Sequence, residues 1–255
     1  MKDDFRQDDF RQDDFLGPPD QVRALIELEP TRSDDPAGTA LALKQVCRVA
    51  ARILPAQAVA VSLMTAQGPS GIVAALDRAS GVVEELQFLL GEGPGWDAFE
   101  TRAPVLVTDL QAGGAQRWPG YCAAVGAHGM RAAFAFPLFV GSARLGVLGI
   151  YRAEPGRISD ETLAVALSLA DLATETLLDG QEVAGASGIP PGVDAVLESR
   201  FAVYQAQGMV MVQLGVPLTE ALARLRAHAY SEDRTLGAVS RDVVARTLSL
   251  EADRR

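Results

Sequence analysis

The stretch from Ala132 to Tyr151 reads AAFAFPLFVGSARLGVLGIY and is the most informative segment of this 255-residue chain. Two apolar runs, 132–140 and 145–151, are separated by Gly141-Ser142, a dipeptide typical of turns. Both runs have the length of a strand and are rich in aromatic and branched residues. The segment therefore predicts a β-hairpin, with the two strongest strands of the chain.

Shorter apolar runs upstream of the hairpin predict the rest of a sheet. They lie between turn residues, at Val59–Met64, Gly71–Ala75, Val82–Leu90 and Val105–Thr108. Helical spacing predicts a helix over 37–54, and Ser159 with Thr162 forms a partial capping box for a long helix to about Leu178. This order of elements predicts the α+β fold class, an antiparallel sheet with helices packed on one face.

The first 35 residues differ from the rest of the chain in charge and in repetition. The tripeptide Asp-Asp-Phe ends at Phe5, Phe10 and Phe15, and residues 1–35 hold 11 acidic and 5 basic residues. A five-residue period fits neither one helix face nor a strand, so we expect a disordered acidic tail. We prefer a solvated tail or a remnant of cloning to the alternative, an acidic segment that attracts a basic partner.

The remaining chain divides into two domains. Residues 36–180 form the predicted α+β domain, residues 181–192 are a linker rich in Gly and Pro, and residues 193–255 form an all-α domain of three helices. In the first of these helices, apolar residues follow the 4-3-4-3 spacing of a coiled-coil seam at Leu197, Phe201, Tyr204, Gly208 and Met211. Because three short helices make a small core, this seam predicts a homodimer.

Composition excludes several classes of protein. With 33 acidic and 23 basic residues the net charge is −10, which excludes a uniformly basic nucleic-acid binder but not a local basic patch. Two cysteines, Cys47 and Cys122, cannot build a disulfide framework, and two histidines leave little for a His-rich metal site. We see neither a signal peptide nor an uninterrupted apolar stretch of about 20 residues. We therefore expect a cytoplasmic protein without a membrane span or a metal.

The α+β region resembles a GAF sensory domain over about residues 36–180. The stretches that carry the resemblance are Leu90-Gly91-Glu92-Gly93-Pro94, Val107-Thr108-Asp109-Leu110, Arg117-Trp118-Pro119, and Phe136-Pro137-Leu138 before Leu145-Gly146-Val147-Leu148. The order of these motifs is more specific than any one of them. The resemblance implies a small-molecule pocket that is closed by a loop over the sheet.

Four residues are candidates for that pocket. Trp96, Trp118 and Tyr121 are able to line an apolar cavity, although core packing explains them equally well, and His128 is a candidate haem ligand. Relatives that bind cyclic nucleotides carry an Asn-Lys-Phe-Asp-Glu signature, which a chain without asparagine cannot contain. Relatives that attach tetrapyrroles need a Cys before a His, which is also missing. We therefore expect neither cyclic nucleotides nor haem to bind, and the ligand and cofactor are unknown.

Cys122 is a tentative redox residue because Arg117 and Arg131 lie near it in sequence. Some GAF proteins reduce free methionine sulfoxide, so an enzyme of that kind is one alternative function. Those enzymes resemble compact single domains with several active cysteines, whereas this chain has two distant cysteines and an added helical domain. No nucleophile elbow, phosphate-binding loop or CxxC motif is present. We predict that the protein is not an enzyme.

The all-α region resembles the ANTAR domain of transcription antitermination regulators. The stretches that carry this resemblance are Gln205-Ala206-Gln207-Gly208, Glu220-Ala221 followed by Leu225-Arg226, then Ala229, and Arg234 with Leu236 and Val239. The resemblance implies binding to paired RNA hairpins in nascent transcripts. Arg226 and Arg234 match positions of the family, Arg200 shares a helix face with Gln207, and Arg241 adds a further cation.

One residue departs from the ANTAR pattern. The family commonly carries a Lys where this chain has Gln207, and loss of that cation removes one phosphate contact. The two resemblances together predict a signal-responsive RNA-binding antitermination regulator, in which the sensor responds to a small ligand or a redox signal. A dimerisation or partner-docking module that has lost RNA binding is the other alternative.

Overall fold

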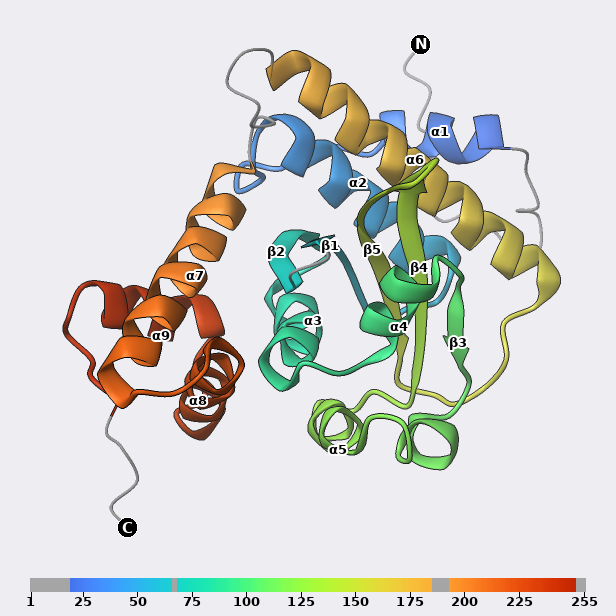
Figure 1. Cartoon of the computed structure of the whole chain (residues 1–255). Coiled ribbons are helices and arrows are strands. Elements are labelled where there is room, and N and C mark those ends of the chain that lie inside the picture. The colour runs from blue at the N-terminus through green and yellow to red at the C-terminus, as the bar shows by residue number, and fades with distance from the viewer. Residues whose placement is uncertain (1–18, 66–67, 185–192, 251–255) are drawn as a thin grey trace.

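The computed structural model describes residues 19–65, 68–184 and 193–250, which form two parts (Figure 1). The larger part is an antiparallel five-stranded sheet covered by helices, and the smaller part is a group of three helices. An α+β domain is therefore followed by an all-α domain, as the sequence predicts.

The sheet has the order β2-β1-β5-β4-β3. Its strands are β1 (Ala58–Thr65), β2 (Gly68–Ala75), β3 (Val105–Val107), β4 (Ala132–Val140) and β5 (Ala143–Arg152). The predicted hairpin is confirmed, because β4 pairs with β5 along its length, with Phe136 opposite Leu148. Gly141 in its turn has a φ of 55°, a conformation that glycine adopts without steric cost.

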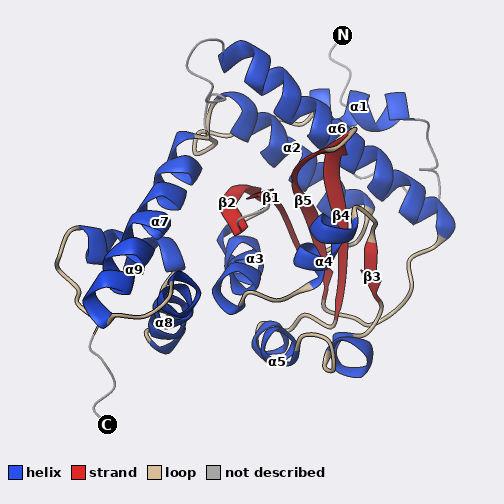
Figure 2. Ribbon diagram, viewed as in Figure 1, coloured by secondary structure: helices blue, strands red, loops and turns tan. Residues whose placement is uncertain are grey.

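Helices cover both faces of the sheet (Figure 2). One face carries α1 (Pro19–Glu27), α2 (Gly38–Ile53) and α6 (Asp160–Ala184). The other face carries α3 (Arg78–Leu90), α4 (Pro94–Thr101), the short π-helical turn η2 (Leu110–Gly114) and α5 (Pro119–Ala127).

The expectation that helices pack on one face is therefore wrong. Successive residues of a strand point to opposite faces, and in β4 both sets are apolar. Phe134 and Phe136 pack in the core beneath α2 and α6, whereas Ala133 and Ala135 pack toward α3, α4 and α5. A strand that is buried on both sides requires a helical layer on each.

The segment Val82–Leu90 is a second correction, because it belongs to α3 and not to a strand. The carboxylate of Asp77 accepts a hydrogen bond of 2.8 Å from the backbone N–H of Ser80 and caps the start of the helix. Gly91 ends it in the left-handed conformation, with a φ of 71°. The run resembles a strand because α3 is apolar on two sides, with Val83 against the sheet and Leu89 on another face.

The N-terminal segment is the third correction. We expect disorder to residue 35, but α1 packs on the domain and Val22 is fully buried in its core. Farther along, Asp35 forms an ion pair of 2.5 Å with Arg48 of α2. The Asp-Asp-Phe repeat itself lies outside the described residues, as do residues 185–192 of the predicted linker.

Three helices form the C-terminal domain, as predicted: α7 (Asp194–Leu214), α8 (Leu218–Ser231) and α9 (Leu236–Val244). Their shared core contains Ala206, Val210, Leu225 and Val239. Gly215 at a φ of 65° ends α7, and Thr235 caps α9 through the backbone N–H of Ala238.

Candidate nucleic-acid interface and sensor site

Arg200 and Gln207 lie on α7, and both side chains have partners. Arg200 donates to the Thr65 hydroxyl at the end of β1 at 3.4 Å, and its guanidinium lies 5.3 Å from the centre of the Tyr204 ring. Gln207 donates from Nε2 to the carbonyl of Leu218 at 2.8 Å. The amide therefore connects α7 to the first turn of α8 at the position where the family commonly has a cation.

Arg226 of α8 is packed against the sensor domain. A Cβ added to Gly91 would lie 2.5 Å from Nη1 of Arg226 and 3.0 Å from its Cζ. Burial lowers the pKa of Arg226, and its Nε has no hydrogen-bond partner among the described residues. Gly91 is the C-cap of α3, where the partial negative charge of the helix dipole favours a nearby cation.

Arg234 and Arg241 complete the predicted RNA contacts. Arg234 forms an ion pair of 2.5 Å with Asp242 and lines a groove between the two domains. Arg241 is exposed on α9. Three of the five predicted residues, Arg200, Arg226 and Arg234, therefore lie on the side of the C-terminal domain that meets the sensor.

The two domains also contact each other through apolar side chains, which sequence reasoning missed. Leu89 of α3 is buried in the core cluster of the C-terminal domain. Val196 of α7 joins the sensor core, and its Cγ1 would lie 3.0 Å from a Cβ on Gly71. The signal in the sequence is the unbroken run Phe88-Leu89-Leu90, which spreads apolar side chains around more than half of the end of α3.

Glu85 contributes a polar contact at the same boundary. Its carboxylate accepts a hydrogen bond of 3.3 Å from the backbone N–H of Leu236, in the first turn of α9. Burial raises the pKa of Glu85 to about 7, with a smaller contribution from the charge of Glu84. The carboxyl group is thus poorly solvated where α3 meets α9.

The interdomain groove beside Glu85 has a volume of about 1010 Å³. Its walls come from β2, α3 and α5 of the sensor and from the end of α8 with the turn that follows it. The charged and titratable groups that line it, besides Glu85, are Asp77, Arg78, His128, Tyr230, Asp233 and Arg234. The groove is the largest hollow that we find among the described residues with walls from both domains.

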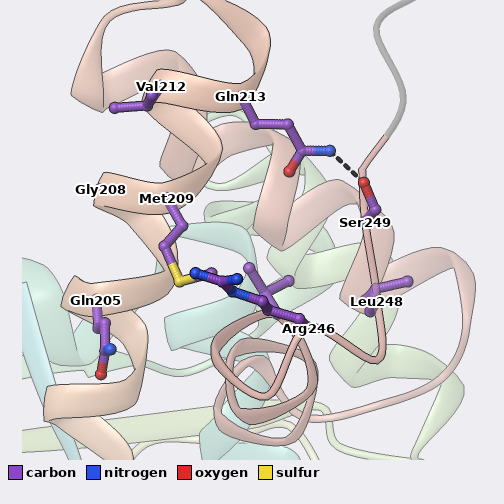
Figure 3. A pocket seen from close by; sticks show the side chains of 9 residues that line it. Gln205, Gly208, Met209, Val212, Gln213, Arg246, Leu248 and Ser249 are labelled. Atoms are coloured by element: carbon purple, nitrogen blue, oxygen red, sulfur yellow. Dashed lines mark hydrogen bonds between the residues drawn. The ribbon is translucent and has the colours of Figure 1, made fainter.

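A second hollow of about 660 Å³ lies on the outer side of α7 (Figure 3). Gln205, Gly208, Met209 and Val212 form its α7 wall, and Arg246 lies across it from the segment after α9. Its lining is mostly apolar. Phe201 and Val212 on α7 are 66% and 75% exposed, so an apolar surface continues along the helix.

Of the four predicted sensor-pocket residues, Trp96 and Trp118 line one hollow of about 260 Å³, whereas Tyr121 and His128 do not line it. Trp96 is half-buried and donates from its indole N–H to the carbonyl of Gln87 at 3.0 Å. Trp118 and Tyr121 are buried in the core between α3 and α5. His128 is exposed and lines the interdomain groove instead.

Polar side chains fill the interior beneath α3. The buried carboxylate of Glu84 accepts hydrogen bonds from the Tyr151 hydroxyl, from Ser62 at 2.7 Å and from Gln87 at 3.2 Å. Burial nevertheless raises the pKa of Glu84. The Tyr121 hydroxyl lies next to Tyr151 and forms no hydrogen bond of good geometry.

Both cysteines are buried thiols. Burial raises the pKa of Cys47 to about 12, and burial followed by the charge of Glu92 raises the pKa of Cys122. A reactive cysteine requires the opposite shift, because the thiolate is the nucleophile. The Sγ of Cys122 instead packs over Gly114, where an added Cβ would lie 2.7 Å from it.

No helix among the described residues is long and apolar enough to cross a membrane. No group of three His, Cys, Asp or Glu side chains in that part of the chain is arranged to hold a metal ion.

Comparison with family models gives two matches: a GAF domain over residues 41–177 and an ANTAR domain over residues 193–244. The fold and these matches define a sensory domain joined to an antitermination-type regulatory domain. The chain belongs to the GAF-domain family and carries an ANTAR domain in its C-terminal part. No curated protein matches it significantly.

Solved structures with similar folds include two GAF domains of phosphoenolpyruvate-protein phosphotransferases. The Acinetobacter domain is 12% identical with a TM-score of 0.49, and the match covers 66% of this chain and 96% of the Acinetobacter chain. The Coxiella burnetii domain is 18% identical with a TM-score of 0.49, covering 65% and 93%. Free methionine-R-sulfoxide reductase from Neisseria meningitidis, solved with its substrate, is 14% identical with a TM-score of 0.45, covering 65% and 89%.

We predict that Tyr151→Phe destabilises the sensor domain by about 1–3 kcal/mol, because the Glu84 carboxylate loses a donor and the Gln87 amide loses an acceptor in a buried site. Urea denaturation of the full chain measures the change. The control is Tyr204→Phe, which removes a hydroxyl from an exposed residue. A loss below about 0.5 kcal/mol, the usual size of a surface effect, would contradict the prediction.

We predict that Glu85→Gln stabilises the protein more at pH 8 than at pH 5. In the folded protein the Glu85 carboxyl holds its proton up to about pH 7, whereas in the unfolded chain it loses the proton near its ordinary pKa. Wild-type stability therefore falls as the pH rises between these values, and the neutral amide removes that dependence. Thermal unfolding at both pH values measures it, with exposed Glu100→Gln as the control. Equal stabilisation at the two pH values would contradict the prediction.

Proposed function

We propose that the protein is a transcription antitermination regulator whose C-terminal domain binds RNA hairpins in nascent transcripts. The observation that carries this proposal is the ANTAR match over residues 193–244, downstream of a sensory domain. We further propose that it acts in the cytoplasm as a homodimer and has no enzymatic activity.

Arginines supply the phosphate contacts in this proposal. RNA hairpins are held by cations on the phosphates and by planar groups that stack on unpaired bases, and the guanidinium group serves both purposes. Arg200, Arg226, Arg234 and Arg241 come from all parts of the C-terminal domain, and Gln207 supplies a neutral amide where the family commonly has a Lys. Because each lost cation lowers the number of released counterions, affinity is weaker than with a Lys at that position.

The sensor domain responds to a small ligand in this proposal, and we favour a ligand over a redox signal because burial raises the pKa of Cys122. Of the four pocket candidates, His128 lies in the interdomain groove, while Trp96, Trp118 and Tyr121 lie closer to the sensor interior. A ligand that binds one domain arrangement better than another shifts the population of the RNA-binding form.

Dimerisation follows from the outer face of α7. Core residues cover one side of this helix, yet Phe201, Tyr204 and Val212 stay exposed on the other side. Leu197 packs partly on the sensor core and Met211 partly on the core of the C-terminal domain. A helix that is apolar on both sides needs a partner on each, and a second copy of α7 provides one.

We predict that Gln207→Lys tightens RNA binding and steepens its dependence on salt. One added phosphate contact changes the slope of log K against log salt by about one unit. Fluorescence titration of the full chain with labelled two-hairpin leader RNAs, at two salt concentrations, measures both effects. Arg241→Ala, at an exposed cation, is expected to act in the opposite direction.

The matched control for this experiment is Gln213→Lys, which adds the same charge elsewhere on α7. Equal gains from Gln207→Lys and Gln213→Lys would show a non-specific effect of charge. Binding by none of these proteins at tens of micromolar would contradict RNA binding. The dimerisation or partner-docking alternative would then describe the domain better.

We predict that Phe201→Glu converts a dimer into a monomer, because an unpaired charge would be buried in the α7 contact. Light scattering at micromolar concentration measures the mass. Val140→Glu places the same charge at another exposed apolar residue, in the sensor domain, and is expected to leave the dimer intact. A wild-type monomer, or dissociation by both variants, would contradict the prediction.

A further inference from the structure

One end of α3 forms the sensor's contact with α8 and α9. Leu89 is buried in the core cluster of that domain, and the backbone of Gly91 lies against Arg226. Glu85, one helical turn before Leu89, accepts the N–H of Leu236 at the start of α9. Apolar, charged and backbone contacts to α8 and α9 thus come from a single helix end of the sensor.

The cations proposed for RNA binding lie along this contact. Arg226 is packed on Gly91, Arg234 lines the groove that α3 forms with the turn after α8, and Arg200 donates to Thr65 of β1. Gly91 excludes a phosphate group from one side of the Arg226 guanidinium, since the space beside Nη1 is too small there even for one methyl group.

From this arrangement we propose that helix α3 of the sensor and RNA compete for the same surface of the C-terminal domain. The described arrangement is the form that excludes RNA, and binding requires α3 and α8 to separate. This inference rests on the proposed function, because it assumes that RNA uses Arg226 and its neighbours. Beyond the proposed function, the inference identifies α3 as the surface of the sensor that blocks these arginines.

The contact has the properties of one that opens reversibly. The Nε of Arg226 is buried without an acceptor among the described residues, and no described carboxylate forms an ion pair with this side chain. A buried donor without a partner costs free energy, which reduces the advantage of the closed form. RNA phosphates offer the charged acceptors that Gly91 lacks, so RNA stabilises the open form.

Gly91 provides the test because a side chain there acts on Arg226 directly. Gly91→Ala places a Cβ against Nη1 and Cζ, so the guanidinium of Arg226 must move away from the end of α3. Gly129→Ala is the matched control: its φ of 79° is close to the 71° of Gly91, so the backbone strain is similar, and a Cβ on Gly129 meets no atom within 4 Å. The two variants therefore differ in the contact with Arg226.

A second variant opens the contact without strain in the backbone. Leu89→Gln keeps the size of the side chain but places an amide in the core cluster of the C-terminal domain. Circular dichroism and thermal unfolding of each full-length variant establish that the sensor domain is folded. Hydrogen exchange of residues 218–231 reports whether α8 has separated from α3.

The measured quantity is the affinity of the full chain for the labelled two-hairpin leader RNAs. If about a tenth of the wild-type molecules are open, complete opening tightens binding about tenfold. We expect this gain for Leu89→Gln, together with faster exchange in α8, and tighter binding for Gly91→Ala, which displaces the Arg226 guanidinium. For Gly129→Ala we expect a change of less than about twofold.

Two other results would overturn the proposal in different ways. If the opening variants show faster exchange in α8 but bind RNA as the wild type does, the contact does not block RNA, and the proposed function stands without this inference. If wild type, Gly91→Ala, Leu89→Gln and Gln207→Lys all fail to bind any RNA of the panel, the inference falls together with RNA binding itself.

Discussion

The burial of β4 and β5 on both faces is the constraint on which the rest of the structure depends. In β4, Phe134 and Phe136 point to one side and Ala133 and Ala135 to the other, and none of the four is exposed to solvent. Apolar surface on both sides of a sheet must be covered twice. The chain meets this requirement with α1, α2 and α6 on one face and with α3, α4 and α5 on the other.

Helix α3 is also apolar on two sides, and both sides are buried. Val83 and Leu86 face the sheet, so the helix is fixed in orientation, and Leu89 then points away from the sensor core. An apolar side chain on that face is stabilised by burial, and α7, α8 and α9 remove it from solvent. Docking of the C-terminal domain is thus a consequence of how α3 packs. Helix α7 likewise carries apolar side chains on its outer side, where Phe201 and Val212 are exposed.

Charged groups lie where these packed layers meet, and their environment sets what they can do. Glu84 is surrounded by hydroxyl and amide donors inside the sensor, which fills the space beneath α3 with the protein's own polar atoms. Glu85 and Arg226 lie at the domain boundary, each with a pKa shifted toward the neutral form by burial. Apolar contacts therefore stabilise the boundary. The burial of Glu85 and Arg226 lowers its stability, which favours a contact that opens reversibly.

Local sequence alone determined the hairpin, because Gly141-Ser142 and the flanking apolar runs act within neighbouring residues, and it determined the three C-terminal helices through their spacing and the breaks at Gly215 and Pro217. Only the tertiary structure decided that Val82–Leu90 is a helix, since its apolar residues fit either structure until two opposite surfaces contact them. It also decided the surroundings of Arg226. The residue type and helix position are local properties, but its neighbour Gly91 belongs to another domain, and no sequence pattern records which distant backbone will exclude solvent from a cation.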